Sequence, residues 1–369
     1  MSLSCSVRAA ISGLTPYAPG LSIDEIRGRF GLTHVIKMAS NENPLGVPPL
    51  AREAIRRHAD SAFRYPQGGN PRLVTAIARH HHVAEDRIVV GNGSDEIIDL
   101  LIRMRGVAGT SNIVCFDPCF SIYPIQSRIC GVEVRRLPVQ PDFSLDVRKL
   151  GALADEHTVL VFVTTPDNPS GYVTPASALR ELAAALPAQA LLVVDEAYMD
   201  FVDDEQATSL LAAGEDLPNV LFLRTFSKSF GLAGLRLGYG VLPAELAGYY
   251  WRARLPFSVN ILAEEAGLAA LADTDFRQET LRVVREGRAV LSEGFRALGC
   301  TVYPSGANFI MLEPPAGKAD AAALFEGLLR RGIIIRPLKS YGLPHLLRVS
   351  VGSPDENAAL LRACAELLA

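Results

Sequence analysis

Short apolar runs alternate with longer segments of helical periodicity along most of the chain. The strand-like runs occur at 88–90, 113–116, 132–137, 159–163, 191–194, 220–224 and 237–241. Between them, apolar residues recur at helical spacing over 72–84, 95–105, 120–130 and 176–186. Apolar runs without polar alternation are typical of strands buried on both faces. The pattern predicts an α/β domain over about 36–250, with a mostly parallel sheet and helices on both faces.

A different pattern begins after about residue 260. Long helical segments come first, and short strand-like runs follow near 300–304, 308–312, 333–336 and 346–350. This order predicts a smaller α+β domain. A chain of 369 residues, 49% of them hydrophobic, is long enough to form two such domains.

Charge and hydropathy narrow the class of protein. The net charge is −4, and both signs are spread along the chain without a long basic run, so nothing favours nucleic acid or an anionic membrane as a partner. No apolar stretch reaches the roughly 18 residues that a membrane span needs. The segment Met1–Arg8 lacks the apolar core of a signal peptide. We therefore expect a cytoplasmic protein.

Cysteine and histidine spacing gives no metal site. The six cysteines fit neither a disulfide framework nor a zinc motif, so we expect reduced thiols. His80, His81 and His82 are consecutive. Consecutive helix positions point about 100° apart and cannot converge on one ion. We expect this run to be a solvated helix end.

The run Thr225–Gly231 suggests a particular chemistry. It places Lys228 among small, hydroxylated and apolar neighbours, with Arg236 eight residues further on. A lysine that forms a Schiff base needs a desolvated amine. Ser227 and Arg236 offer the hydroxyl and the bidentate cation that a phosphate monoester needs. Together they suggest pyridoxal phosphate (PLP), although a lysine in a Gly-rich turn is the plainer interpretation.

Two strand ends upstream support the same chemistry. Asp195 follows the apolar run 191–194, where it could pair with the protonated ring nitrogen of PLP. Asn168 follows the run 159–163, and either it or Tyr198 could bond the phenolic oxygen of the ring. Taken singly, Asp195 could equally cap a helix, and Asn168 could belong to an ordinary Asn-Pro turn.

A glycine-containing turn adds a possible anion site. The strand 88–90 runs into Gly91-Asn92-Gly93, and Ser94 and Asp95 then begin a helical pattern. Backbone N–H groups at a helix start bind anions. No Gly-Lys-Ser/Thr follows, so this is not a P-loop. By itself the turn does not separate a nucleotide from PLP.

In this order, the motifs resemble those of fold-type I PLP-dependent aminotransferases of class I/II, and most closely those of the histidinol-phosphate aminotransferases. The resemblance runs nearly end to end. It also rests on the segments 39–46, 64–66, 117–123, 255–260, 335–338 and 347–352.

The resemblance implies roles for residues around the cofactor. Lys228 forms the Schiff base and moves the proton, Asp195 pairs with the ring nitrogen, and Tyr198 with Asn168 bonds the phenolic oxygen. Phe120 stacks on the ring, where the family often has Tyr. The positions that match the phosphate side are Ser94, Asp95, Ser227 and Arg236.

It also implies a substrate end and a subunit contact. Arg348 matches the residue that grips the substrate carboxylate, whereas Arg336 and Tyr17 match positions near its distal or phosphate group. Tyr65 matches a residue that reaches the phosphate of the neighbouring subunit, so a homodimer with shared sites is expected. In the family the small domain is discontinuous, here 1–35 with 251–369.

The resemblance makes L-histidinol phosphate and 2-oxoglutarate the expected substrates, within histidine biosynthesis. Three alternatives share the fold. The first is an aminotransferase for aromatic or other amino acids, in which Tyr17, Phe120 and Tyr123 would surround a substrate ring, and the second is a PLP-dependent decarboxylase of a phosphorylated amino acid. The third is a PLP-binding transcription regulator, for which the chain leaves no room for a DNA-binding module. A dinucleotide oxidoreductase is a weaker alternative, because the third glycine of the Rossmann fingerprint is missing.

Overall fold

The computed structural model describes residues 7–14 and 20–369. Its largest feature is a seven-stranded sheet in the order β2-β8-β7-β6-β5-β3-β4. All neighbours are parallel except β8, which is antiparallel to both β2 and β7. All seven predicted strand runs are confirmed, as β2 (Ile88–Asn92), β3 (Asn112–Asp117), β4 (Glu133–Pro138), β5 (Thr158–Thr164), β6 (Leu191–Asp195), β7 (Val220–Thr225) and β8 (Leu237–Val241).

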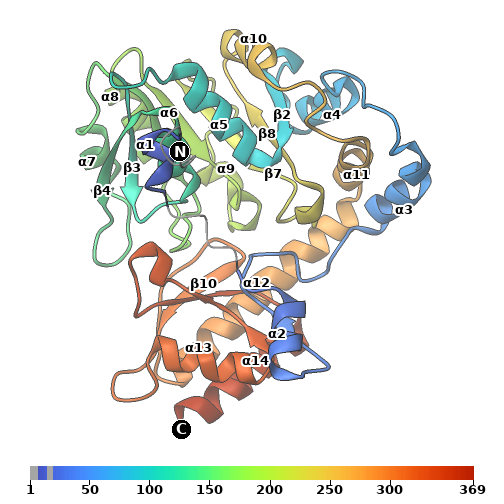
Figure 1. Cartoon of the computed structure of the whole chain (residues 1–369), viewed down its shortest axis with the longest axis vertical. Coiled ribbons are helices and arrows are strands. Elements are labelled where there is room, and N and C mark those ends of the chain that lie inside the picture. Colours follow the sequence, from blue (N-terminus) through green and yellow to red (C-terminus); the bar gives the residue numbers. More distant parts are fainter. Residues whose placement is uncertain (1–6, 15–19) are drawn as a thin grey trace, which may run out of the picture.

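Helices cover both faces of this sheet (Figure 1). Along β6, Leu192 and Val194 join the core on one face, and Val193 joins the core on the other, because successive strand side chains point to opposite sides. The first face is covered by α4 (Pro71–His81), α7 (Val147–Gly151), α8 (Ala176–Ala185) and α11 (Ile261–Ala272). The second is covered by α5 (Gly93–Arg105), α6 (Ile122–Cys130) and α10 (Ala244–Ala253).

The C-terminal part forms a smaller α+β body around a four-stranded antiparallel sheet, as predicted. The strand order is β12-β13-β10-β9, from β12 (Arg336–Pro337), β13 (Leu347–Ser350), β10 (Phe309–Glu313) and β9 (Thr301–Val302). The helices α12 (Thr274–Ala297), α13 (Ala321–Arg330) and α14 (Pro354–Leu368) pack with it. The predicted run 333–336 divides, since β11 (Ile333–Ile334) leaves this sheet and Arg336 begins β12.

An N-terminal segment packs against this smaller body. β1 (Ile36–Lys37) pairs in parallel with β11, and Ile26 of α2 (Ile23–Phe30) shares a small core with Leu329 and Ile334. The domain division at 36 and 250 stays a prediction. However, α11 packs against α3 (Pro49–His58) and α4, beside the central sheet, so the packing favours a boundary near the start of α12. In Figure 1, α12 runs from the larger body into the smaller one.

The histidine run is more buried than predicted. The His81 ring nitrogen Nε2 lies 2.8 Å from the hydroxyl of Tyr239, and burial lowers the pKa of His81 to about 2. The expectation of a solvated helix end is therefore wrong for His81, although α4 does end there. The reason is that Tyr239, a partner distant in sequence, lies beside this end of the helix.

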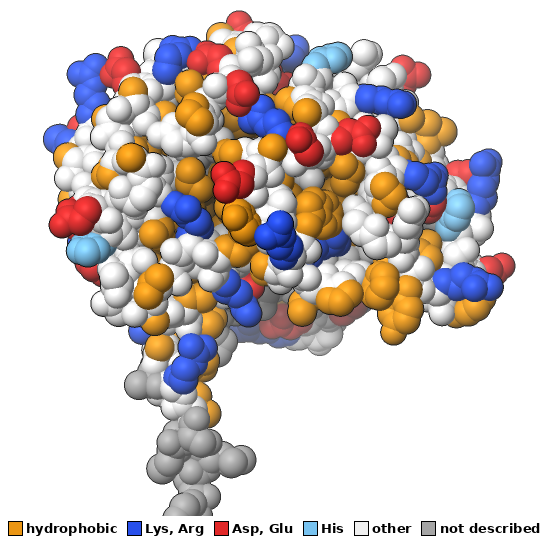
Figure 2. Space-filling view, turned by 90° about the horizontal axis from the view of Figure 1, so that it is seen from above, with side chains coloured by type: hydrophobic (Ala, Val, Ile, Leu, Met, Phe, Trp, Pro, Cys, Tyr) orange, Lys and Arg blue, Asp and Glu red, His pale blue; other side chains and the backbone are white. Residues whose placement is uncertain are grey.

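Within residues 7–14 and 20–369, no three His, Cys, Asp or Glu side chains are grouped so as to hold a metal ion. The cysteines in these ranges are free thiols, and no helix in them is long and apolar enough to cross a membrane. On the face shown in Figure 2, side chains of both charges are interspersed.

Candidate active site

A cavity of about 280 Å³ lies where β5, β6 and β7 end and α5 begins. This is the edge of an open parallel sheet at which ligands bind. Nine of the predicted site residues line it: Ser94, Asp95, Phe120, Asn168, Asp195, Tyr198, Ser227, Lys228 and Arg236. They come from segments spread over about 140 residues of sequence, and the parallel order of the strands brings them together.

Lys228 lies in a tight turn directly after β7. The amide of Gly231 donates to the Lys228 carbonyl, and a Cβ atom at Gly231 would lie 2.1 Å from the carbonyl oxygen of Gly46, so only glycine fits there. The lysine amine donates to the carbonyl of Ser40 at 3.3 Å. Burial, and then the charge of Arg348, lower the pKa of Lys228 to about 8. Near neutral pH, a larger fraction of this amine is therefore neutral and nucleophilic than in an ordinary lysine.

Asp195 is the last residue of β6 and faces the same cavity. Its carboxylate accepts a hydrogen bond of 2.6 Å from the hydroxyl of Tyr123 and one of 3.1 Å from the amide of Ala197. Burial raises its pKa to about 6. Within the described residues, no Lys, Arg or His forms an ion pair with Asp195. A buried carboxylate in this state suits a cationic group of a ligand.

The start of α5 and the turn before β8 form a close contact beside Lys228. Gly93 donates its amide to the Arg236 carbonyl at 2.8 Å, and the Arg236 guanidinium lies 3.1 Å from the Asp95 carboxylate. A Cβ atom at Gly238 would lie 2.3 Å from the Ser94 nitrogen. Glycine at 238 thus lets β8 approach the free N–H groups of the first turn of α5, where an anion can bind.

Arg348 is buried at the interface between the two bodies. Its Nη1 donates to the Oδ1 of Asn168, its Nη2 donates to the Ala39 carbonyl at 3.1 Å, and its guanidinium lies 5.1 Å from the centre of the Phe309 ring. Its Nε is buried without a hydrogen-bond partner in the described part of the chain. It contacts the cavity wall through Asn168 rather than lining it.

The remaining predicted substrate residues are Arg336 and Tyr17. Arg336 is the register partner of Arg348 across β12 and β13. A Cβ atom at Gly20 would lie 3.7 Å from the Arg336 guanidinium and 3.4 Å from the Ser40 hydroxyl, so Arg336 lies towards the Ser40 side of the cavity. Tyr17 lies outside the described residues.

Tyr65 does not line the cavity of its own chain. It is 79% exposed, and its ring stacks on Phe257 with centroids 4.7 Å apart.

Sequence reasoning missed two residues that hold the site. Tyr123 was expected to flank a substrate ring in one alternative, which is wrong: it is 1% exposed, and its hydroxyl bonds Asp195 and Thr164. Asn41, from the Asn-rich segment 39–46, donates to the Tyr198 hydroxyl at 3.0 Å. The segment 39–46 contributes to the family resemblance, but nothing in the local sequence indicates which asparagine faces inward.

Comparison with known proteins gives the same family that the motifs suggested. A profile of the family "Aminotransferase class I and II" matches residues 33–364. The chain is 62% identical over 368 residues to a histidinol-phosphate aminotransferase of Nitratidesulfovibrio vulgaris, covering 100% of this chain and 98% of that relative. It is 39% identical to a histidinol-phosphate aminotransferase of Symbiobacterium thermophilum, with 97% of each chain covered.

A solved structure agrees with these relatives. The crystal structure of histidinol-phosphate aminotransferase from Sinorhizobium meliloti, in complex with pyridoxal-5'-phosphate, matches with a TM-score of 0.86 at 27% identity, covering 98% of this chain and 97% of that one. The fold-type I architecture predicted from the sequence is therefore confirmed. Because the family profile spans most of the chain, the protein belongs to the aminotransferase class I and II family.

Proposed function

We propose that this aminotransferase uses PLP to convert L-histidinol phosphate and 2-oxoglutarate into imidazole acetol phosphate and L-glutamate. The observation that supports it most is one cavity at which three features meet: a lysine of lowered pKa, the start of a helix, and a buried carboxylate that no cation pairs with in the described residues. The similarity to histidinol-phosphate aminotransferases over the full chain supports the choice of substrate.

The residues present fit the cofactor. Asp195 offers a buried anion for a protonated ring nitrogen, and Lys228 offers an amine of lowered pKa for the aldehyde. Phe120, Ser94 and Ser227 line the cavity, and Ser94 lies in the first turn of α5. We infer that Ser94, Ser227 and Arg236, with the backbone N–H of Asp95, hold the phosphate, and that Asn168 and Tyr198 bond the phenolic oxygen.

PLP, when bound, supplies an electron sink for the pair of electrons left when the substrate Cα–H bond breaks. The chain supplies everything else. Lys228 would accept the Cα proton at Nζ and deliver it to the carbon that bears the aldehyde in free PLP, and a pKa of about 8 lets Nζ take up and release a proton near neutral pH. Asp195 keeps the ring nitrogen protonated. Tyr123, by donating to Asp195, helps to keep that carboxylate ionised although it is buried.

The substrate end must accept two different anions. Histidinol phosphate carries a phosphate and no carboxylate, whereas glutamate carries two carboxylates. Arg348 and Arg336 stand opposite each other across an antiparallel pair, where like charges are unfavourable unless an anion or another charge compensates them. We infer that this pair binds the phosphate of one substrate and a carboxylate of the other. Planar guanidinium groups suit both.

A donor–acceptor panel tests this function. Purified holoenzyme is supplied with 2-oxoglutarate and with histidinol phosphate, phenylalanine or a phosphorylated amino acid, while glutamate and carbon dioxide are measured. We expect glutamate with histidinol phosphate as the best donor and no carbon dioxide. Faster turnover of phenylalanine would favour the aromatic aminotransferase, and carbon dioxide release would favour the decarboxylase.

We further infer that the active unit is a homodimer in which Tyr65 reaches the partner's phosphate site. Tyr65 is exposed beside Phe257, and the neighbouring chain positions Phe63 and Leu255 are also exposed, at 78% and 71%. Such apolar side chains at the surface are typical of an interface. A location in the cytoplasm stays a prediction.

Mixed dimers test the sharing of sites. Tyr65→Phe and Lys228→Ala subunits are mixed, and each hybrid should contain one site free of both changes. Activity of the mixture above both parents is expected. No gain, despite subunit exchange demonstrated by mass spectrometry, would contradict sharing.

A further inference from the structure

The residue after the lysine points away from the cavity into a buried polar network. Ser229 is fully buried, and its hydroxyl donates to the Asp200 carboxylate. The other carboxylate oxygen of Asp200 accepts a bond of 2.8 Å from Arg277, on the first turn of α12. Burial alone would raise the pKa of Asp200, but Arg277 and Arg224 hold it well below its usual range. Asp200 is therefore an anion that joins the lysine turn to α12.

A second contact joins the same two segments one turn further along the helix. The side-chain amide of Asn43 lies 3.3 Å from the Lys228 carbonyl and 2.9 Å from the Ser229 carbonyl, and donates to both. It also lies 3.2 Å from the hydroxyl of Thr280, which is fully buried in α12. Two independent bridges thus run from residues 228 and 229 to positions 277 and 280 of one helix.

The far part of that helix belongs to the smaller body. Val284, Leu291 and Phe295 of α12 pack in the same core as Phe309 and Val349. Val349 is next to Arg348 in β13. Because a helix transmits displacement as a rigid element, a shift of the smaller body moves the bridges and the arginine together.

We propose that Asp200 and Asn43 are positioning residues, which with Ser229 form a latch that fixes the Lys228 amine relative to the smaller body and Arg348. This inference rests on the proposed function, in which Lys228 is the reacting amine. Neither Asp200 nor Asn43 lines the cavity, so each acts through the lysine turn and not by touching substrate.

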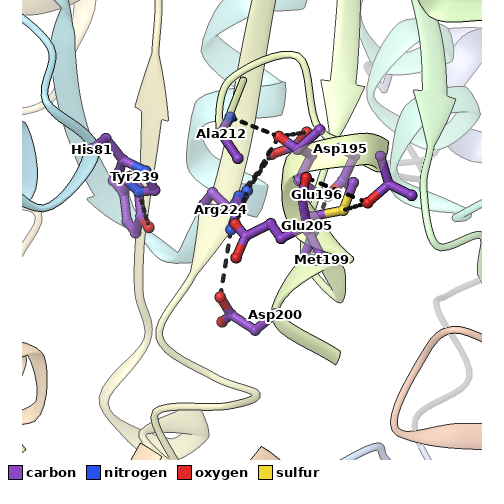
Figure 3. A network of polar contacts seen from close by, with 12 residues as sticks. His81, Asp195, Glu196, Met199, Asp200, Glu205, Ala212, Arg224 and Tyr239 are labelled. Carbon is purple, nitrogen blue, oxygen red and sulfur yellow. Dashed lines mark hydrogen bonds and ion pairs between the residues drawn. The ribbon is translucent and has the colours of Figure 1, made fainter. Parts of the chain in front are cut away.

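The network itself offers a matched control. Figure 3 shows Arg224 between Glu196, Glu205 and Asp200. Glu205 contacts Arg224 at 2.9 Å and Arg277 at 3.9 Å, as Asp200 contacts both arginines, but no bond joins it to Ser229 in the described residues. Glu205→Gln therefore removes a network charge and leaves the latch intact.

The first test is amide hydrogen exchange of the full-length protein. The amides of Phe226, Gly231 and Leu232 are bonded within or beside the turn and report its opening. Losing a hydrogen bond to a charged group should make them exchange roughly 10- to 100-fold faster in Ser229→Ala and Asp200→Asn. Glu205→Gln should leave them unchanged. Wild-type rates in Ser229→Ala, or equal acceleration in Glu205→Gln, would overturn the latch.

The second test separates positioning from a merely structural role. In steady-state transamination, Ser229→Ala should lower kcat about tenfold and change the KM for 2-oxoglutarate by less than about twofold, because the anion contacts persist. A turn that exchanges faster while kcat stays at the wild-type value would overturn the positioning role. If wild-type protein fails the donor panel, the proposed function fails, and hydrogen exchange alone still decides whether the latch exists.

Discussion

Two buried arginines in this protein have opposite surroundings. Arg224, in β7, is 4% exposed and lies within ion-pair distance of three carboxylates, those of Glu196, Asp200 and Glu205. Arg348, in β13, is 6% exposed and donates to an amide oxygen and a backbone carbonyl, and no carboxylate pairs with it in the described residues. Within the described part of the chain, carboxylates compensate Arg224, whereas none compensates Arg348.

We infer from this difference that Arg224 is structural and that Arg348 binds a ligand. A buried charge costs several kcal/mol unless it is paired. Arg224 meets that cost with its own carboxylates. The Nε of Arg348 has no hydrogen-bond partner among the described residues, and we propose that an incoming anion completes its environment. A protein can retain a destabilising buried charge at a position where that charge serves binding.

The largest expected effect comes from the lysine between these two regions. Lys228→Ala removes the nucleophile and the proton carrier, so turnover should fall by several orders of magnitude while both arginine environments stay intact. Borohydride reduction and peptide mapping of wild-type holoenzyme should find the pyridoxyl group on Lys228. Its appearance on another lysine would contradict the whole site assignment.

Arg348→Ala should strongly weaken anion binding without unfolding the protein. Two charge-assisted hydrogen bonds at about 1.5–3 kcal/mol each predict a loss of roughly 10²–10⁴ in kcat/KM. Arg348→Lys should recover little, because an ammonium group cannot replace the planar fork. Steady-state kinetics with histidinol phosphate and 2-oxoglutarate measure both variants. A loss of less than about tenfold in Arg348→Ala would mean that the two arginines do not differ as described.

Arg224→Met should mainly lower the stability of the fold, in contrast to Arg348→Ala, which should mainly lower kcat/KM. It leaves three carboxylates close together in a buried site, and removing one partner of a buried ion pair costs about 3–5 kcal/mol. Urea unfolding should show a clear fall in the midpoint, larger than that of Arg348→Ala, whose former partners are neutral. A midpoint within error of the wild type would show that Arg224 is not the stabilising centre of the network.

Arg336→Ala should cause the smallest loss of activity, and that loss should depend most on which amino donor is used. It should lower kcat/KM for histidinol phosphate about 10- to 100-fold, and lower that for an uncharged aromatic donor less. The ratio of the two constants is the measurement. An equal loss for both donors would make Arg336 structural and leave the substrate supported by similarity alone.

The sequence predicts the features of the fold and the site that depend on neighbouring residues, but not those that depend on contacts between distant segments. Lys228, Asp195 and Asn168 each follow an apolar run, and parallel strands place such ends at one edge, so the strand pattern and the cavity could be predicted together. The antiparallel direction of β8 could not, since strand direction leaves no trace in the apolar pattern.

Contacts between distant segments escaped prediction for the same reason. Nothing near Tyr123 indicates that its hydroxyl meets Asp195, which is 72 positions away in sequence. The environments of Arg224 and Arg348 are also set by tertiary contacts. The sequence shows two arginines at strand positions, and only the fold shows that one has three carboxylates and the other has none in the described residues.

The most direct test is thermal unfolding of wild-type and Arg348→Ala holoenzyme, each with and without maleate, a dicarboxylate that cannot be transaminated. A ligand that binds only the folded state raises the Tm. We predict that maleate raises the Tm of the wild type and not that of Arg348→Ala, while the two proteins without maleate unfold within a few degrees of each other. An equal rise with maleate in both proteins would contradict the claim that Arg348 is the buried cation awaiting an anion.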